Sequence, residues 1–354
     1  MKKTPPAPAA APRPRPRARA EGGVTLQDVA RLAGVSPMSA SRALNTPARV
    51  SQDILQRVQE AVARTGYVRN SLAGALASRR SRLVAALVPN VAGPVFQDLI
   101  QALIAALGSA GYQLILAQSG YGVLPDDLLN AVLGQRPDGL VLAGVVPSAQ
   151  GRQRLQSAGL PVVETWDMVA EPVDMLVGFS HEQIAGAVAT HLIADGRRQL
   201  AFVGGEHARA QRRARSFVSA ALDKRRTARG HADAVAVESV PAPADVRSGR
   251  DALARILARQ PKTDAVFCSS DLLALGVVTE AQARGIRIPE QLAVVGFGDL
   301  SFAADVLPAL TTVRIDSAAI GATAARFIVE RAEGRPVAAT TVDVGFSIVT
   351  RDTA

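Results

Sequence analysis

The sequence has almost no cysteine and no long apolar run. Cys268 is the only cysteine in 354 residues, which excludes an internal disulfide framework and fits a reducing compartment. The histidines do not have zinc-ligand spacing, so we expect no metal and no cofactor; they are His181, His191, His207 and His231. The N-terminal MKKTPPAPAAAPRPRPRARAEGG lacks the apolar centre of a secretory signal, and no later run is long enough to span a bilayer. We therefore expect a cytoplasmic protein that does not associate with a membrane.

The sequence also lacks the motifs of common enzymes. No GxGxxG turn follows the first predicted strand, and no phosphate-binding loop is present. No nucleophile, base and orienting residue can be assembled into a catalytic set, so we expect that the protein is not an enzyme. Apolar residues nonetheless make up 48% of the chain. A chain of this length and composition buries a large core and holds more than one domain.

Positive charge is concentrated in the first quarter of the chain. Residues 1–82 contain 15 Lys and Arg against four acidic residues, a net charge of +11, whereas the whole chain carries +9. A basic module joined to a nearly neutral body suggests a reader of nucleic acid with a regulatory domain. Residues 1–23 are rich in Pro, Ala and Arg and predict a disordered basic tail. This tail is a solubilising leader or an additional contact to a polyanion.

From Leu83 onward, short apolar runs alternate with amphipathic helical segments. The runs include LVAALVP, YQLILAQ, GLVLAG, MLVGFS, QLAFVGG, DAVFCSS and LAVVGF, a pattern typical of parallel sheets covered by helices on both faces. The strands are too many for one sheet, so we expect two α/β lobes, with a change of lobe near Ser180 and return crossings after Asp299. A helix beginning at Pro94 is expected to bury one apolar face. That face comprises Phe96, Leu99, Ile100, Leu103, Ile104 and Leu107.

Polar residues follow many of these strands. Ligands of open parallel sheets bind beyond the carboxyl ends of the strands, so two such lobes predict a small-molecule site in a shared cleft. The residues concerned are Asn90, Gln118, Ser119, Glu164, Trp166, Asp167, Ser270, Asp271 and Asp299. Several of them are alternatively helix caps. For Asp271 we favour the cap, and for Asp299 both interpretations stay open.

The stretch VTLQDVARLAGVSPMSASRALN predicts a helix, a short turn and a second helix. Thr25 is expected to cap the first helix with Asp28 at the capping-box position, and Gly34 ends it. Ser36 caps the second helix, whose first residue is Pro37. A third helix follows, capped by Ser51, packed through Ile54, Val58 and Val62, and ended by Gly66. This is a helix-turn-helix arrangement.

The second helix is expected to present a DNA-reading face. Ala40 and Leu44 point inward, whereas Met38, Ser39 and Arg42 lie together on the other side. Such a face can bind in a groove of DNA, because an Arg can contact a phosphate or donate two hydrogen bonds to the edge of a guanine. The alternative is that this polar face is simply exposed to water and contacts no DNA.

A helix of about two turns is predicted over residues 70–77. It is too short and too rich in small residues to be stable alone. Leu76 is its one bulky apolar residue near the far end, and two paired copies would present it as a wedge for the minor groove. The alternative is a flexible basic linker.

These motifs resemble the lactose-repressor family of bacterial transcription factors. The resemblance rests on VTLQDVARLAGVS, SASRALN, VSQDILQRVQEAVARTGYVRNSLAGALAS, DAVFCSSDLLALG and VVGFGDL, and extends from residue 24 to about residue 350. Within the family, PNVAGPVFQDL, AGYQLILAQSGYG and LPVVETWD are most similar to the gluconate-utilisation repressors.

The resemblance implies a domain order. It gives the tail over 1–23, an all-α helix-turn-helix domain over 24–69, a hinge helix and linker over 70–82, and a two-lobed α/β effector and dimerisation domain over 83–354. The effector domain resembles type I periplasmic binding proteins, with parallel sheets.

The resemblance also implies site residues. Pro37 and Met38 begin the base-reading part of the recognition helix, Arg42 lies one turn later, and Leu76 enters the minor groove with Ala73 beside it. The full set of predicted DNA-contacting residues is Thr25, Ser36, Pro37, Met38, Ser39, Ser41, Arg42, Asn45, Tyr67, Asn70, Ala73 and Leu76. The predicted effector-contacting residues are Asn90, Phe96, Gln118, Trp166, Asp167, Arg213, Ser270 and Asp299.

Three positions depart from the family pattern. Ser216 replaces a usual Gly, which leaves the choice between Arg212 and Arg213 open. Arg69 stands where Pro is common, and Gly298 where Asp is common, which leaves Asp299 as the acidic ligand.

We therefore predict a repressor that binds double-stranded operator DNA as a homodimer and is released by its effector. The predicted effector is gluconate or a related sugar acid, gripped by one of the two arginines, although neutral sugars use such an Arg in this family too. Since only TRDTA follows the apolar stretch TVDVGFSIV, we expect a dimer and not a tetramer. The alternatives are a receptor for sugar uptake and a regulator of a different sugar or purine pathway.

Overall fold

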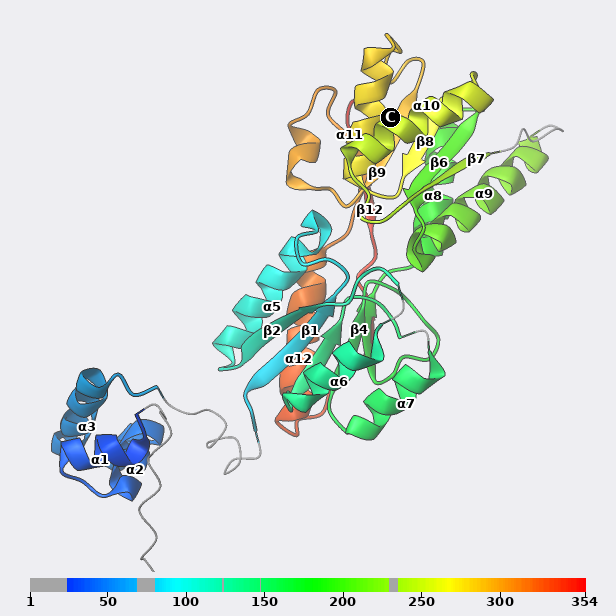
Figure 1. The fold of residues 1–354 in the computed structure, drawn as a ribbon. Helices are drawn as coiled ribbons and strands as arrows, with labels where there is room; N and C mark the ends of the chain where they lie inside the picture. The colour runs from blue at the N-terminus through cyan, green and yellow to red at the C-terminus, as the bar shows by residue number, and fades with distance from the viewer. Residues whose placement is uncertain (1–23, 69–79, 123, 147, 229–234) are drawn as a thin grey trace, which may run out of the picture. The chain divides into compact units, whose positions relative to one another are not determined.

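The computed structural model describes residues 24–68, 80–122, 124–146, 148–228 and 235–354. The chain divides into two compact units, Met1–Ala77 and Ser78–Ala354, which Figure 1 shows as a small helical unit and a larger α/β unit. The predicted tail over 1–23 and most of the predicted hinge over 70–82 lie outside the described residues.

The first unit contains the predicted three helices. They are α1 (Leu26–Ala33), α2 (Pro37–Asn45) and α3 (Gln52–Thr65), with a short 3-10 helix at Pro47–Arg49. Thr25 and Asp28 form the predicted capping box, and Ser36 accepts a hydrogen bond from the Ser39 N–H at 3.0 Å. Gly34 and Gly66 end α1 and α3 with φ of 64°, a conformation that glycine adopts without the steric cost of a Cβ. The predicted caps and helix ends are confirmed.

Small apolar residues hold the three helices together. The core consists of Val29, Ala30, Ala33, Ala40, Ala43, Val58 and Ala61, with Leu26, Ile54 and Val62 half-buried around it. Alanines at these contacts let the helix backbones approach closely. The buried side of α2 is therefore narrow, and its other side is left to solvent.

The second unit begins with a parallel sheet that forms lobe 1. The strand order is β11-β5-β4-β3-β1-β2. The strands are β1 (Leu83–Val88), β2 (Gln113–Gln118), β3 (Gly139–Leu142), β4 (Val162–Thr165), β5 (Met175–Gly178) and β11 (Thr341–Asp343). One face packs against α5 (Gln97–Ser109) and α12 (Ser317–Ala332), and the other against α6 (Asp126–Gly134) and α7 (Ala149–Ala158).

A second sheet forms lobe 2, with the order β12-β10-β9-β8-β6-β7. Its strands are β6 (Leu200–Gly205), β7 (Ala236–Val240), β8 (Ala265–Cys268), β9 (Ala293–Phe297), β10 (Thr311–Arg314) and the antiparallel β12 (Ser347–Val349). Helices α8 (His181–Ala194) and α9 (Ala208–Ala228) pack on one face, and α10 (Val246–Arg259) and α11 (Asp271–Ala283) on the other.

The chain crosses between the lobes three times. The crossings lie between β5 and α8, between β10 and α12, and between β11 and β12. The predicted change of lobe near Ser180 and the return crossings after Asp299 are confirmed, as is the fold class. No helix in the described part of the chain is long and apolar enough to cross a membrane.

The structure corrects the predicted helix at Pro94. Pro94–Phe96 is a 3-10 turn and α5 begins at Gln97. Leu99, Leu103 and Leu107 are fully buried, but Ile104 is 47% exposed. Ile104 lies at the margin of the apolar stripe centred on the buried leucines, because successive residues rotate by about 100° around a helix.

Candidate functional site

The exposed side of α2 carries the predicted base-reading residues. Met38 is 70% exposed and Arg42 is exposed beside it. Among the described residues no carboxylate pairs with Arg42, whereas Arg31 and Arg57 are paired to acidic side chains of their own helices. Arg42 therefore presents an uncompensated guanidinium next to an exposed apolar side chain, as a groove-reading surface needs.

The hydroxyl and amide groups of α2 are held in place by their neighbours. Ser36 Oγ lies 2.9 Å from Ser39 Oγ, and the Asn45 amide donates to Ser41 Oγ at 3.1 Å. Pro37 lies exposed at the first position of α2.

The other predicted DNA contacts lie at the ends of the helical unit or beyond it. Thr25 is engaged in the α1 capping box, and Tyr67 packs half-buried against the helical core. The predicted contacts Asn70, Ala73 and Leu76 lie outside the described residues.

A cavity of about 260 Å³ lies between the two lobes. Five of the eight predicted effector contacts line it: Asn90, Phe96, Trp166, Arg213 and Ser270. The lining also includes Tyr121, His181, His207, Arg209, Ser269, Phe297 and Leu300, which the sequence analysis did not single out. Most of these follow the ends of strands, so a complete search beyond each strand end would have found them.

Arg213 is a buried cation of the first cavity. It comes from α9 and is 3% exposed, with its guanidinium carbon 4.2 Å from the centre of the Phe297 ring. Nη2 donates to the Ser269 carbonyl at 3.2 Å and Nη1 contacts His181 Nδ1 at 2.9 Å. Nε has no partner. Burial and the neighbouring Arg209 lower the pKa of Arg213 to about 9, so it stays charged at neutral pH.

His181 connects Arg213 to the opposite lobe. An Arg only donates, so His181 Nδ1 accepts from Arg213 and Nε2 donates to the Trp166 carbonyl at 3.1 Å. Burial, followed by the charge of Arg213, lowers the pKa of His181 far below its usual value and keeps the ring neutral.

Trp166 forms an aromatic wall of the first cavity. Its ring contacts Phe96 edge-on, with centroids 4.9 Å apart, and Phe179 at 5.5 Å. Its backbone has a φ of 65°. This left-handed conformation is energetically unfavourable for residues other than glycine and is typical of ligand sites. The indole N–H is buried, and no residue that the structure describes accepts a hydrogen bond from it.

Arg212 and Asp167 form an ion pair between the lobes. Arg212 Nη1 lies 2.6 Å from Asp167 Oδ1, and Arg212 Nε lies 3.5 Å from Glu182. Asp167 is 1% exposed, and burial raises the pKa of its carboxyl although Arg212 opposes this effect. The two neighbouring arginines therefore have different surroundings, since Arg213 lines the first cavity and Arg212 does not.

A second cavity of about 190 Å³ adjoins the first. It is formed by the loops that follow β1, β2, β3 and β4 and by the first turns of α9. Its lining includes Ser119, Gly120, Tyr121, Gly122, Gly144, Val146, Asp167, His207, Arg209 and Arg212.

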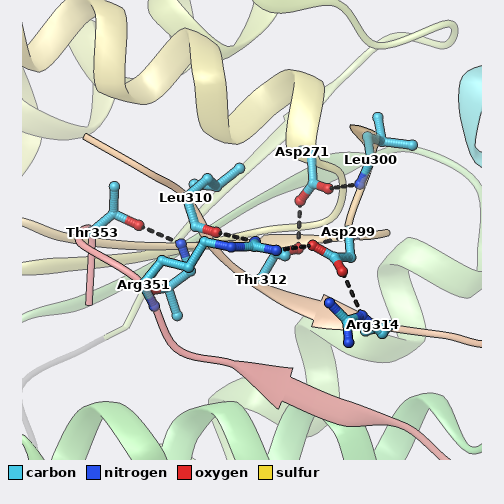
Figure 2. Close-up of polar contacts among 9 residues, drawn as sticks. Asp271, Asp299, Leu300, Leu310, Thr312, Arg314, Arg351 and Thr353 are labelled. Carbon is cyan, nitrogen blue, oxygen red and sulfur yellow. Dashed lines mark hydrogen bonds and ion pairs between the residues drawn. The ribbon is translucent and has the colours of Figure 1, made fainter. Parts of the chain in front are cut away.

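Gln118 and Asp299 line neither cavity. Gln118 is exposed and its side-chain oxygen accepts from the Val91 N–H at 3.2 Å. Figure 2 shows Asp299 held between two arginines, Arg314 at 2.5 Å and Arg351 at 2.7 Å. Asp299 thus ties the loop after β9 to the C-terminal segment.

The structure corrects our interpretation of Asp271 as a helix cap. Ser270 caps α11, and Asp271 is a fully buried carboxylate. As Figure 2 shows, it accepts from Thr312 Oγ1 at 2.5 Å and from the Leu300 N–H at 2.7 Å. Burial raises the pKa of Asp271 to about 6. Asp271 therefore positions Leu300, which lines the first cavity.

Comparison with known proteins assigns the family. Residues 25–70 match the description "Bacterial regulatory proteins, lacI family", and residues 189–354 match "Periplasmic binding protein-like domain". The chain is 35% identical over 343 residues to the transcriptional regulator GntR of Pseudomonas aeruginosa, covering 94% of this chain and 96% of the relative. The chain belongs to the LacI family of bacterial regulatory proteins. It is a ligand-responsive transcriptional regulator and not an enzyme.

Solved structures agree with this membership. A LacI-family regulator from Silicibacter pomeroyi matches with a TM-score of 0.84 and 30% identity, covering 93% of this chain and 99% of that one. The regulator GntR from Chromobacterium violaceum matches with a TM-score of 0.70 and 32% identity, covering 77% of this chain and 98% of that one. LacI-family regulators bind operator DNA and small-molecule effectors and act as dimers, so the helical unit and the interlobe cavity have their counterparts in the family.

Proposed function

We propose that this LacI-family regulator is a repressor of sugar-acid utilisation genes that acts in the cytoplasm. In this proposal a sugar acid, gluconate or a keto derivative, binds between the lobes and releases the protein from its operator. The observation that carries the proposal is the buried, charged Arg213, whose Nε lacks a partner in the interlobe cavity.

An acidic ligand explains two unsatisfied donors. Arg213 Nε and Trp166 Nε1 are both buried without a hydrogen-bond acceptor in the described part of the chain, and both residues line the first cavity. A buried donor without an acceptor costs about 1–3 kcal/mol. A carboxylate supplies acceptors to both sides of the cleft once the lobes part to admit it, and charge-assisted bonds of this kind are among the strongest available.

The rest of the cavity suits a hydroxylated carbon chain. Asn90 and Ser270 offer hydrogen bonds from opposite lobes, and Phe96 and Trp166 cover the C–H face. The sequence resembles the gluconate-utilisation repressors, and the similar proteins from Pseudomonas aeruginosa and Chromobacterium violaceum bear the name GntR. Both facts support gluconate among the acids.

On the DNA side, we propose that α2 reads one half-site per subunit in the major groove and that Leu76 widens the central minor groove. The effector then needs only to favour the conformation with low DNA affinity. Lowering operator affinity a hundredfold takes about 2.7 kcal/mol of coupling, within reach of a few hydrogen bonds in the cleft.

The main alternative is an effector from another sugar or purine pathway, because an Arg in this place also binds neutral sugars. Trp166 is the only tryptophan in the chain, and it lines the cavity, so its fluorescence reports ligand binding directly. We expect gluconate or ketogluconate to change this emission and to release a labelled operator, and ribose, galactose and hypoxanthine to do neither. Release by one of the latter, with both acids inert, would overturn the sugar-acid assignment and leave the regulator assignment intact.

A further inference from the structure

The two cavities share part of their walls. Tyr121, His207 and Arg209 line both of them. The Tyr121 and His207 rings stack with centroids 5.4 Å apart, and Arg209 reaches across the lobes to donate to the Ala143 carbonyl at 3.0 Å. A ligand that passes beside these side chains has access to both cavities.

The two cavities differ in the hydrogen-bonding groups that they leave unsatisfied. The first cavity has unpartnered donors, on Arg213 and Trp166. Asp167, which lines the second cavity, has an acceptor to spare: Oδ1 takes both the Arg212 and the Met168 hydrogen bonds, and the buried Oδ2 takes none from the described residues. The first cavity therefore calls for an acceptor, such as a carboxylate, and the second for a donor, such as a hydroxyl group.

The arginines around the cavities outnumber the nearby acidic residues by one. The described lining residues include three arginines, Arg209, Arg212 and Arg213, and one carboxylate, Asp167. Glu182 lies 3.5 Å from Arg212 and offsets a further charge. One positive charge is left over, which a single carboxylate balances. A phosphate in the second cavity would lie beside Asp167 but also beside Arg209 and Arg212, so 6-phosphogluconate is the acid that tests whether this cavity takes a second anion.

From this polarity we infer that the preferred ligand is an aldobionic acid, a sugar acid that carries a second, neutral sugar ring. This inference rests on the proposed function and refines it. The carboxylate binds Arg213 in the first cavity, and a hydroxyl of the second ring donates to Asp167 in the second cavity. Gluconate alone satisfies only the first of these sites.

Gly122 offers a way to block the second cavity alone. It lines that cavity and not the first, and a Cβ added there meets no atom within 4 Å. Its φ is not in the left-handed region, so Gly122→Leu strains neither the backbone nor a neighbour at Cβ and adds bulk at the wall of the second cavity. Gly134, at the end of α6, also has open space and lines neither cavity. Gly134→Leu is therefore the matched control.

The test is calorimetric titration of the full-length wild type and both variants with gluconate, 6-phosphogluconate, cellobionate and maltobionate. We expect at least one aldobionate to bind the wild type tenfold or more tightly than gluconate. Gly122→Leu is expected to remove this advantage while leaving gluconate binding unchanged, and Gly134→Leu to retain it.

Three results would overturn the inference and leave the proposed function standing. They are gluconate binding that equals or exceeds that of both aldobionates, tighter binding of 6-phosphogluconate, and an aldobionate advantage that survives Gly122→Leu. If none of the four acids binds, the proposed function fails as well. Thermal unfolding of the two variants shows whether either one is misfolded.

Discussion

Individual arginines of this protein differ in function according to what surrounds them. Arg213 is buried with its charge retained, Arg212 is paired across the lobes, and Arg42 is exposed without a partner among the described residues. The sequence alone left the choice between Arg212 and Arg213 open, because adjacent helical residues differ by about 100° in direction and the helix register was not known. The proposed roles of Arg213 and Arg42 lead to two predictions.

Arg213→Ala should weaken gluconate binding by about 2 kcal/mol or more, because the carboxylate loses its charged partner. Calorimetric titration measures this directly. Arg215→Ala, on the exposed side of the same helix, should bind gluconate as the wild type does. Unchanged binding in the Arg213→Ala variant would remove Arg213 from the site.

Arg42→Ala should weaken operator binding by about 1–3 kcal/mol while leaving gluconate affinity unaltered. The side chain lies on the exposed face of a well-capped helix, so the fold does not depend on it. Fluorescence anisotropy with a labelled operator measures the loss. Arg57→Ala, whose side chain is paired with Asp53 on α3, serves as the control, and equal affinities for the two variants would contradict our orientation of α2.

At the scale of elements, local signals were predictable and long-range contacts were not. The caps Thr25, Ser36 and Ser51 mark helix starts within three or four residues of sequence, so the helical unit was predicted almost completely. The pairing of Asp299 with Arg351 joins residues 52 positions apart, and nothing in the local pattern indicates it. Tyr121 and His207 follow the ends of β2 and β6, so their positions could have been predicted, but their stacking on each other across the lobes could not.

Asp271 should make the stability of lobe 2 depend on pH. Burial raises its pKa from 3.8 to about 6, so between about pH 4 and pH 6 the folded state holds this proton more tightly than the unfolded state does. The resulting stabilisation is present at low pH and is lost as pH rises through about 6. Denaturation of wild type and Asp271→Asn should therefore give a wild-type advantage that shrinks from pH 4 to pH 7. A constant difference would contradict the prediction, and Asp251→Asn, at an exposed position of α10, is the control.

Helices α10 and α11 pack closely at two glycines. A Cβ on Gly276 would collide with the Val246 carbonyl oxygen, and one on Gly249 would collide with the Leu273 carbonyl oxygen. Both obstacles are backbone, so Gly276→Ala should cost about 1–3 kcal/mol of unfolding free energy. Gly186→Ala in α8, where no atom lies within 4 Å of the added Cβ, should be neutral or slightly stabilising. Urea denaturation that ranks the two variants equally would show that α10 and α11 tolerate separation.

At the scale of the whole molecule, the proposed release mechanism requires reciprocal coupling. If gluconate lowers operator affinity by a given factor, operator must lower gluconate affinity by the same factor. We expect both factors to be near a hundredfold. Titration of gluconate into the free protein and into its complex with an operator duplex measures one factor, and operator binding with and without gluconate measures the other. Gluconate binding that is indifferent to operator would contradict an effector that acts by release.

The three crossings between the lobes also determine when each lobe becomes complete during synthesis. Lobe 1 begins at β1, but α12 and β11, which cover one face of its sheet and extend its edge, follow all but the last strand of lobe 2 in the chain. A nascent chain that ends before Ser317 therefore leaves the apolar residues beneath α12 uncovered. The helical unit, by contrast, leaves the ribosome first and needs nothing that follows it to form its core. The helix-turn-helix unit is thus complete long before the interlobe cavity. An unfinished polypeptide therefore has the DNA-binding helices but lacks a complete effector-binding site.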